Sequence, residues 1–246
     1  MREDRSRVAV ITGASRGLGL ALARALADRG WALVVDARGG EALERARAEL
    51  ARSTNVRANA GDVADEAHRN RLIEEAASLG GLDLVVNNAS LLGPSPQPTL
   101  AEYPLDVLED VYRANVLAPL RLIQLALPLL RESNDGRILN ITSDAAVEGY
   151  EGWGGYGSSK AALEQLTNVL AGEQPALRVY WVDPGDMNTQ MQQEAFPGED
   201  VSDRPPPEAS VPGLLHLVEG DLPSGRYRAR DLAPVGPVAR AGGGRA

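Results

Sequence analysis

Residues 12–19 read TGASRGLG, and they lie between an apolar run, Val8–Thr12, and a stretch with leucine and alanine at helical spacing, Leu18–Arg29. Glycines in this spacing permit a tight turn, close approach of the backbone to a pyrophosphate, and close packing of a helix on a strand. The free N–H groups at the start of the helix attract phosphate oxygens. The segment therefore predicts a dinucleotide-binding turn, with a purely structural Gly-rich turn as the alternative. The contacts that we expect come from Gly13, Ser15, Arg16, Gly17, Leu18 and Gly19.

The same segment also matches the G-x-S-x-G nucleophile elbow of hydrolases. A hydrolase would need an oxyanion-hole loop before Ser15, yet only one predicted strand precedes it, and a later histidine. The two histidines are His68, in a predicted surface helix, and His216, near the end of the chain, and both suit structural or solvated positions. We therefore disfavour a hydrolase. With no cysteine and only these histidines, we expect no disulfide, no thiolate chemistry and no metal site.

Further apolar runs alternate with helical stretches along the rest of the chain. The runs are Trp31–Val35, Val56–Val63, Leu82–Asn87, Arg137–Thr142 and Leu177–Val182, and the helical stretches are Glu41–Ala51, Glu66–Leu79, Leu105–Arg131, Ser158–Leu170 and Pro207–Glu219. Pro119 and Pro128 should bend or divide the long stretch. Six strands interleaved with helices predict an α/β fold, a doubly wound, Rossmann-type parallel sheet with helices on both faces.

The length of 246 residues fits one domain, which we place at residues 1–230. Within it, the polar, Pro-containing residues 186–210 are expected to form a substrate lid, and residues 231–246 a loosely ordered tail. The net charge is −9 and no basic stripe is present, which argues against nucleic acid as a partner. A polar start at Met1–Arg7 and the lack of long apolar runs predict a cytoplasmic protein without a membrane partner.

Tyr156 and Lys160 are four residues apart and should share one helix face. A lysine ammonium beside a phenol favours the phenolate, which should lower a tyrosine pKa of about 10 toward neutral pH. Ser143 follows the fifth predicted strand at its carboxyl end, where parallel sheets bind ligands. These three residues are therefore predicted to meet at one edge of the sheet.

From residue 7 to about residue 190, the chain resembles the compact, single-domain short-chain dehydrogenases/reductases. The resemblance rests on Thr12–Gly19, Asp62-Val63, Asn87-Asn88-Ala89, Asn115, Ser143, Tyr156, Lys160, Pro184-Gly185 and Thr189. It implies an oxidoreductase that transfers a hydride between a nicotinamide cofactor and a carbonyl or alcohol substrate.

The resemblance also implies roles for the catalytic residues. Tyr156 is expected to be the general acid in reduction and the base in oxidation. Ser143 should hydrogen-bond the same substrate oxygen, and Lys160 should hold the nicotinamide ribose and tune Tyr156. Asn115 should support a water-linked proton path to Lys160, although a capping or kinking role in a helix is also open.

Further cofactor contacts follow from the same resemblance. Asp62 is expected to accept a hydrogen bond from the adenine amino group beside the backbone of Val63, unless it caps the helix that begins at Glu66. The remaining expected contacts line the cleft or face the nicotinamide and its phosphate, and they are Asn88, Ala89, Pro184, Gly185 and Thr189. For Pro184-Gly185, a simple turn is the alternative.

The cofactor preference depends on the end of the second strand, which reads Asp36-Ala37-Arg38. An acidic residue there contacts the ribose diol of NAD, whereas arginine accommodates the 2′-phosphate of NADP. In the family's register the deciding position falls on Ala37, with Arg38 next, and Arg16 adds a second positive charge. We therefore expect NADP(H), with NAD(H) left open because Asp36 either pairs with Arg38 or reaches the ribose.

Three departures from the family pattern stand out. Ser90 replaces the glycine of the usual Asn-Asn-Ala-Gly, which should crowd or reshape the floor of the cleft. The stretch between Asn115 and Ser143 is a few residues longer than is usual in the family, and we place the extra residues at Glu132–Gly136, before the fifth strand. The C-terminal third lacks the usual closing strand sequence, of which residues 224–227 look like a remnant.

The substrate stays unidentified at this level. Met187, Met191 and Phe196 in the lid, with Tyr150 and Trp153, suggest a partly apolar pocket with aromatic walls, unless they only pack under a loop. The alternatives to a dehydrogenase are a non-catalytic NADP(H)-binding sensor or scaffold on the same fold, and a dehydratase or isomerase that uses the same tyrosine. Apolar helical faces at residues 105–131 and 157–171 lead us to expect a homodimer or homotetramer.

Overall fold

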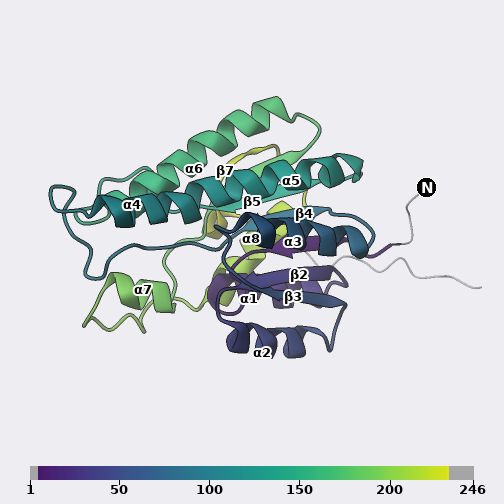
Figure 1. Cartoon of the computed structure of the whole chain (residues 1–246), viewed down its shortest axis with the longest axis horizontal. Coiled ribbons are helices and arrows are strands. Elements are labelled where there is room, and N and C mark those ends of the chain that lie inside the picture. The colour runs from purple at the N-terminus through teal and green to yellow at the C-terminus, as the bar shows by residue number, and fades with distance from the viewer. Residues whose placement is uncertain (1–4, 233–246) are drawn as a thin grey trace, which may run out of the picture.

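The computed structural model describes residues 5–232 and contains a seven-stranded, fully parallel sheet in the order β3-β2-β1-β4-β5-β6-β7 (Figure 1). The strands are β1 Val8–Ile11, β2 Ala32–Ala37, β3 Val56–Ala60, β4 Leu84–Asn87, β5 Arg137–Ile141, β6 Arg178–Asp183 and β7 Gly225–Arg228. Strands β1, β2, β4 and β5 are buried at every residue, which explains why they read as continuous apolar runs. The doubly wound α/β sheet is confirmed.

Helices cover both faces of the sheet. On one face lie α1 (Gly17–Ala27), α2 (Gly40–Leu50) and α8 (Val211–Glu219), whose buried side chains form one core with Ile11 and Val35. On the other lie α3 (Glu66–Ser78), α5 (Ala118–Glu132) and α6 (Gly154–Glu173), packed on the opposite sides of β1 and β2. Alternate residues of each central strand thus point into two separate cores.

The predicted long helix is divided next to Pro119, but it is not divided at Pro128. Helix α4 (Leu105–Tyr112) passes into one turn of π-helix, Arg113–Leu117, and then into α5. Pro119 lies in the first turn of α5, directly after the π-turn, and Pro128 lies inside α5 without ending it. The expectation that Pro128 divides the region is therefore wrong, and the π-turn, which contains Asn115, marks the break instead.

The C-terminal third contains more regular structure than the sequence predicts. Residues 225–228 form β7, which pairs with β6, so the family's closing strand is present and the sheet has seven strands rather than six. The predicted lid contains a short helix, α7 (Gln190–Ala195), and α8 follows a 3₁₀ turn at Pro207–Ser210. Most of the predicted tail, residues 233–246, lies outside the described residues. Among residues 5–232, no helix combines the length and apolarity that crossing a membrane requires.

Candidate active site

A cavity of about 1280 Å³ opens at the carboxyl ends of the strands. Its volume exceeds that of a typical small-molecule pocket, up to about 1000 Å³, and suits a dinucleotide together with a substrate. Sixteen of the eighteen residues that the sequence predicts as site residues line it. They are Gly13, Ser15, Arg16, Gly17, Leu18, Arg38, Asp62, Val63, Asn88, Ala89, Ser143, Tyr156, Lys160, Pro184, Gly185 and Thr189. Gly19 and Asn115 are the two that do not line it.

The Gly-rich turn is shaped for an anion. Gly13 and Gly17 have φ angles of +67° and +57°, a left-handed conformation that favours glycine. The residue before α1, Arg16, makes no side-chain capping bond. The first amides of α1 therefore remain for a ligand, as a phosphate site at a helix start requires.

Thr12 holds the turn in place, a role that the sequence reasoning did not assign. Its hydroxyl oxygen accepts hydrogen bonds from the backbone N–H groups of Asn88 and Ala89, each at 3.0 Å. The side-chain amide of Asn88 donates back to the carbonyl oxygens of Thr12 and Gly13, at 2.9 and 3.2 Å. Asn88 thus joins the ends of β1 and β4. The position of Thr12 directly before Gly13 was the feature of the sequence from which this role could have been predicted.

Gly19 serves packing and lies behind the cavity lining. A Cβ atom at this position would lie 2.5 Å from the carbonyl oxygen of Gly13 and 2.6 Å from Nδ2 of Asn88. Both distances are far shorter than van der Waals contact, and one of the atoms belongs to the backbone. Only glycine therefore lets α1 approach the turn this closely.

Asp36 lies beneath the turn and is 1% exposed. Its carboxylate accepts a 2.7 Å hydrogen bond from the N–H of Gly13, and its second oxygen lies 3.0 Å from Nε2 of His68. Burial raises the pKa of Asp36, while the hydrogen bonds from His68 and Gly13 act in the opposite direction. Of the two roles left open for Asp36, pairing with Arg38 is wrong for this structure, because its carboxylate is paired with His68 instead. Asp36 also lines the cavity, and contact with a ribose stays a prediction. His68, expected on a surface helix, is buried at 5% exposure.

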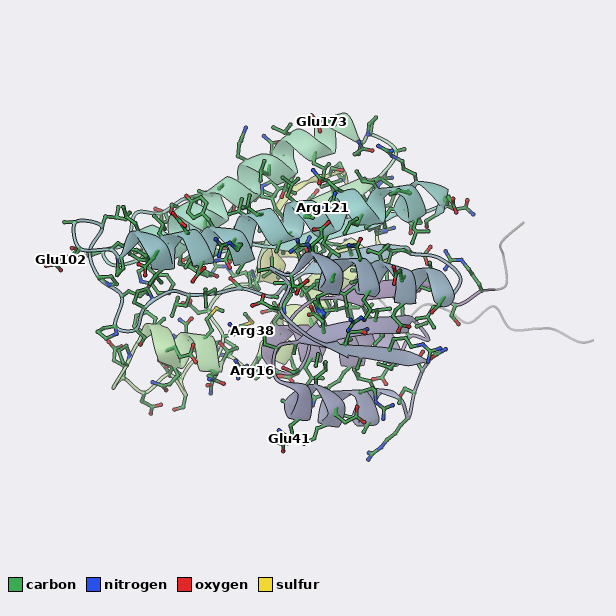
Figure 2. All side chains as sticks on the ribbon, in the orientation of Figure 1. Arg16, Arg38, Glu41, Glu102, Arg121 and Glu173 are labelled. Carbon is green, nitrogen blue, oxygen red and sulfur yellow. The ribbon has the colours of Figure 1, made fainter. Side chains whose placement is uncertain are left out.

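Two arginines flank the open end of this region. Figure 2 shows Arg16 and Arg38 near each other, between α2 and α7, and both side chains are exposed. Arg16 donates a hydrogen bond to Gln190 of α7. Within residues 5–232, the guanidinium of Arg38 has no ion pair or hydrogen bond. The left-handed glycines, the uncapped helix start and these cations together fit an anionic dinucleotide.

Tyr156 and Lys160 lie side by side on α6, which begins at Gly154 rather than at Ser158. Both side chains are buried, and Nζ of Lys160 lies 5.4 Å from the centroid of the Tyr156 ring. The ammonium donates a hydrogen bond to the carbonyl oxygen of Ile141, at 2.9 Å. Ser143 follows β5 at the same edge, and its hydroxyl donates to Asp144 at 3.0 Å. The predicted juxtaposition of phenol, ammonium and hydroxyl at one cavity is present.

Burial shifts the pKa values of both groups against charge. The pKa of Lys160 falls to about 8 because its ammonium is desolvated. The pKa of Tyr156 rises above its ordinary value, mainly through burial and also through Asp144 and Asp183, against a lowering hydrogen bond with Ser90. The expectation that Lys160 lowers the pKa of Tyr156 below its ordinary value is therefore wrong for this structure, because desolvation outweighs any attraction between them.

Asn115 is fully buried in the π-turn, and its side chain is saturated. Its oxygen accepts hydrogen bonds from Ser90 Oγ at 3.1 Å and from the N–H of Leu91 at 2.7 Å. Its amide donates to the carbonyl of Leu91 at 2.9 Å and to Ser159 Oγ at 3.0 Å. A primary amide makes no more bonds than these. Any water-linked path would have to use the backbone carbonyl of Asn115 instead.

The remaining predicted residues have local structural contacts as well. Asp62 accepts a hydrogen bond from the N–H of Ala64, and the cap of α3 is Asp65, so the capping role considered for Asp62 is wrong. The hydroxyl of Thr189 caps α7. Gly185 has a φ angle of +78° and Ser210 donates to the carbonyl of Pro184, so this pair forms a fixed turn that also lines the cavity.

Aromatic side chains form the other wall of the cavity. The ring of Trp153 lies 5.8 Å from that of Tyr156, edge to face, and 5.9 Å from that of Phe196 in the lid segment. Leu92 and Met191 join this cluster. The same wall contains one polar contact, in which the hydroxyl of Tyr150 donates a hydrogen bond to Asp144 at 3.0 Å. In the described part of the chain, no three His, Asp or Glu side chains gather to hold a metal ion.

Comparisons with known proteins agree with this site. A family model described as short chain dehydrogenase matches residues 7–200. A rhamnolipid-biosynthesis 3-oxoacyl-[acyl-carrier-protein] reductase of Pseudomonas aeruginosa is 33% identical, over 93% of this chain and 87% of its own length. A benzil reductase of Saccharomyces cerevisiae, (S)-benzoin forming, is 34% identical over 76% of this chain and 74% of its own. A short chain dehydrogenase of Shigella flexneri, solved with NADP, superposes with a TM-score of 0.85 at 31% identity, covering 92% of this chain and 98% of that one.

Proposed function

Because the chain belongs to the short-chain dehydrogenase/reductase family, we propose that it transfers a hydride between NADP(H) and a carbonyl or alcohol substrate, with Tyr156 as the proton-transferring residue. The observation that carries this proposal is the pair of Tyr156 and Lys160, buried side by side at a cavity with an anion-binding turn. A bound nicotinamide cofactor would supply the hydride, and the residues of this chain handle the proton.

Reduction is the direction that the site favours. Since burial raises the pKa of Tyr156, its phenol is protonated at neutral pH and is ready to act as a general acid toward a carbonyl oxygen. Ser143 follows the end of β5. Its hydroxyl can turn from Asp144 to the substrate carbonyl oxygen and stabilise the charge that develops there. Lys160, with a pKa of about 8, remains mostly cationic at pH 7 and holds the anionic cofactor's ribose region.

We assign NADP(H) as the preferred cofactor from two residues at the end of β2, Asp36 and Arg38. Asp36 is buried and engaged with Gly13 and His68, so it is not free to select a ribose diol. Arg38 is exposed at the cavity edge and unpaired among the described residues, as a 2′-phosphate contact requires. Comparing dissociation constants for NADPH and NADH tests this assignment, and tighter binding of NADH would contradict it.

The catalytic proposal is tested with NADPH and a panel of aromatic and aliphatic ketones and diketones, benzil among them, followed by nicotinamide absorbance. The aromatic wall formed by Trp153 and Phe196 favours a bulky, uncharged substrate. Replacing Tyr156 by Phe should lower kcat by about a thousandfold, the range for a lost general acid, while NADPH binding measured by fluorescence stays intact. Undiminished turnover in Tyr156→Phe would contradict the proposal, and NADPH binding with no turnover of any carbonyl would instead support a sensor.

We also propose a homodimer or homotetramer formed through α5 and α6. Leu117, which ends the π-turn directly before α5, and Leu166 and Val169 on α6 are 56%, 36% and 48% exposed, which is unusual for three large apolar side chains. Gel filtration with light scattering over a range of protein concentrations gives the oligomeric state, and a stable monomer at all concentrations would contradict this assignment.

A further inference from the structure

Asp36 and His68 form a buried pair behind the wall of the cavity. Side chains of β2 alternate between the two cores, and Asp36, like Val34, points toward α3, where His68 lies. One carboxylate oxygen lies 3.0 Å from Nε2 of His68, and the other accepts the N–H of Gly13 at 2.7 Å. Asp36 lines the cavity although it is only 1% exposed, so its charge lies directly behind the surface that a ligand would touch.

His68 is the partner that can neutralise this carboxylate. Within residues 5–232, no arginine or lysine pairs with Asp36. The ring of His68 packs against Gly61, where a Cβ would lie 2.3 Å from its Nδ1, and Gly61 lines the cavity. Nδ1 makes no hydrogen bond with any residue of this range. A proton can therefore reach Nδ1 from the cavity while Nε2 keeps its own proton toward Asp36.

Other charged groups surround the pair without binding its side chains. Strands β1 and β4 consist of uncharged residues, and Glu66 is neutralised by Arg69 and Arg121. Burial raises the pKa of Asp36, and the charge of Asp62 acts in the same direction. The whole set consists of Arg16 and Arg38 at the cavity edge, Arg57 and Asp62 on and after β3, Asp65, Glu66, Arg69 and Glu75 along α3, and Arg121 of α5.

We propose that this pair sets the affinity for the 2′-phosphate of NADP(H), and with it the choice between NADP(H) and NAD(H). This role rests on the proposed function, in which Arg38 meets that phosphate. With one proton on its ring, His68 is neutral and the pair carries the negative charge of Asp36, which repels the phosphate. When a proton from solvent binds Nδ1, the pair becomes neutral and the repulsion ends, and no other bond forms or breaks.

The charge of the pair is close enough to the phosphate site to affect binding. Arg38 follows Asp36 by two residues, a backbone separation of about 7 Å at roughly 3.3 Å per residue. Histidine is the side chain whose charge ordinarily changes between pH 5 and 8. From Coulomb's law at this range, near a protein surface, we expect the pair to change the affinity for NADPH about tenfold. The affinity for NADH, which lacks the 2′-phosphate, should change about twofold or less.

Two variants fix the pair in its two states of charge. Asp36→Asn removes the charge and keeps both contacts, because the amide oxygen accepts from Gly13 and the amide nitrogen donates to His68. His68→Gln keeps a donor where Nε2 stands but cannot become cationic, so Asp36 stays ionised. Glu102→Gln removes one negative charge elsewhere and is the control, because Glu102 is exposed and Figure 2 shows it well apart from the two arginines at the cavity edge.

Dissociation constants for NADPH and NADH are measured by nucleotide fluorescence at pH 6, 7 and 8 and constant ionic strength. Asp36→Asn should bind NADPH about tenfold more tightly than the wild type at pH 8 and equally tightly at pH 6. The comparison at equal pH removes the ionisation of the phosphate and of Lys160, which both proteins share. His68→Gln should bind NADPH about tenfold more weakly than Asp36→Asn at every pH, and Glu102→Gln should follow the wild type.

Proton uptake gives a second readout that a merely structural role would not change. Titration calorimetry at pH 7, in two buffers of different ionisation enthalpy, should show that NADPH binding takes up more protons in the wild type than in Asp36→Asn. If Asp36→Asn does not fold, the wild type and His68→Gln carry the same test. Their affinities for NADPH should differ about tenfold at pH 6 and agree at pH 8.

Equal pH dependence and equal proton uptake in the wild type and Asp36→Asn would overturn the proposal. A loss of NADH affinity in Asp36→Asn would also overturn it, because the carboxylate would then bind the ribose diol. The expected shifts in a protein that reduces no carbonyl would leave the role of the pair standing and refute hydride transfer. Carbonyl reduction with an NADPH affinity independent of the pair would do the reverse, and a wild type that does not bind NADPH would refute both.

Discussion

The two sides of the cavity are built differently. On the side of the Gly-rich turn, polar groups at the ends of β1, β2 and β4 and on α3 are joined by hydrogen bonds, among them Thr12 with Asn88 and Asp36 with His68. On the opposite side, α7 has no buried residue, and Phe196 after it meets Trp153 only through ring contacts. Residues at the ends of strands form the first side of the cavity, and residues of a surface segment form the second.

From this difference we infer that one side of the cavity serves the cofactor and the other side selects the substrate. A buried polar network has one satisfied arrangement, so its residues cannot be exchanged one at a time without leaving a group unpaired. A half-exposed apolar wall tolerates exchange, because it leaves no polar group behind. The cofactor side should therefore respond to substitution with lost stability, and the substrate side with a changed substrate preference. The following predictions test this contrast, from the largest expected effect to the smallest.

Gly19→Ala should cause the largest effect. The added Cβ would lie 2.5 Å from the carbonyl oxygen of Gly13, so α1 must move away from the turn. We expect a loss of about 3 kcal/mol in the free energy of unfolding, at the upper end for overpacking, with a loss of NADPH affinity of about a hundredfold. Urea unfolding measures the free energy of unfolding, and fluorescence titration measures the affinity for NADPH. Gly172→Ala in α6, where a Cβ meets nothing within 4 Å, is the control and should be neutral or slightly stabilising.

His68→Ala tests the support beneath the turn. It leaves the buried carboxylate of Asp36 with only the N–H of Gly13 as a partner. Removing one partner of a buried polar pair should lower the free energy of unfolding by about 2–3 kcal/mol and weaken NADPH binding. His68→Asn, which retains a donor, should recover part of the loss. Unchanged stability in His68→Ala would contradict the contrast between the two sides.

The buried ammonium of Lys160 should lower the free energy of unfolding at neutral pH. Its pKa in the folded protein is about 8, below the ordinary value of 10.5, so the unfolded chain binds more proton between these values. The free energy of unfolding should therefore rise from about pH 8 to about pH 10.5, and the penalty should be complete below pH 8. Lys160→Met should add roughly 2 kcal/mol at pH 7 and abolish this rise, while activity is lost.

Lys160 is also the only lysine in the sequence, which makes its pKa directly measurable. Protein labelled with ¹³C at the lysine ε-carbon gives a single side-chain resonance, whose titration should have its midpoint near pH 8. A midpoint at the ordinary lysine value would show that the ammonium is solvated, and the expected stabilisation of Lys160→Met would then be absent.

The sequence predicted most of the sheet, because parallel strands buried on both faces are continuous apolar runs. It did not count β7 among the strands, although residues 224–227 were noted as a remnant of a closing strand, because β7 is an edge strand of half-buried polar residues in which Arg226 pairs with Glu164. It also began α6 too late. The glycines at its start resemble a loop, yet a Cβ on Gly155 would lie 2.3 Å from the ring of Tyr103, so tertiary packing requires glycine there.

For the site, motifs with fixed spacing identified the Gly-rich turn, Ser143, Tyr156 and Lys160. The pairing of Asp36 with His68 had no such signal, because the two residues are 32 positions apart and meet only because α3, which connects β3 to β4, packs on β2. Ser90 was noticed as a departure from a family pattern, but its hydrogen bond to Asn115 depends on the π-turn, which no local propensity predicts. The long-range polar contacts of the site therefore could not be predicted from the sequence.

Phe196→Ala should have the smallest effect on stability and the clearest effect on substrate choice. Phe196 is half-buried and contacts Trp153 and, at 4.6 Å, the guanidinium of Arg204. Losing such exposed ring contacts should cost about 1 kcal/mol or less. The KM for benzil should rise about fivefold, the equivalent of about 1 kcal/mol, with kcat and NADPH affinity nearly unchanged, because Phe196 packs on Trp153 rather than on the ring of Tyr156. Leu105→Ala, which truncates a 73% exposed side chain outside the cavity, is the control. A large loss of stability in Phe196→Ala would mean that the lid segment is as firmly determined as the turn, and the contrast between the two sides would fail.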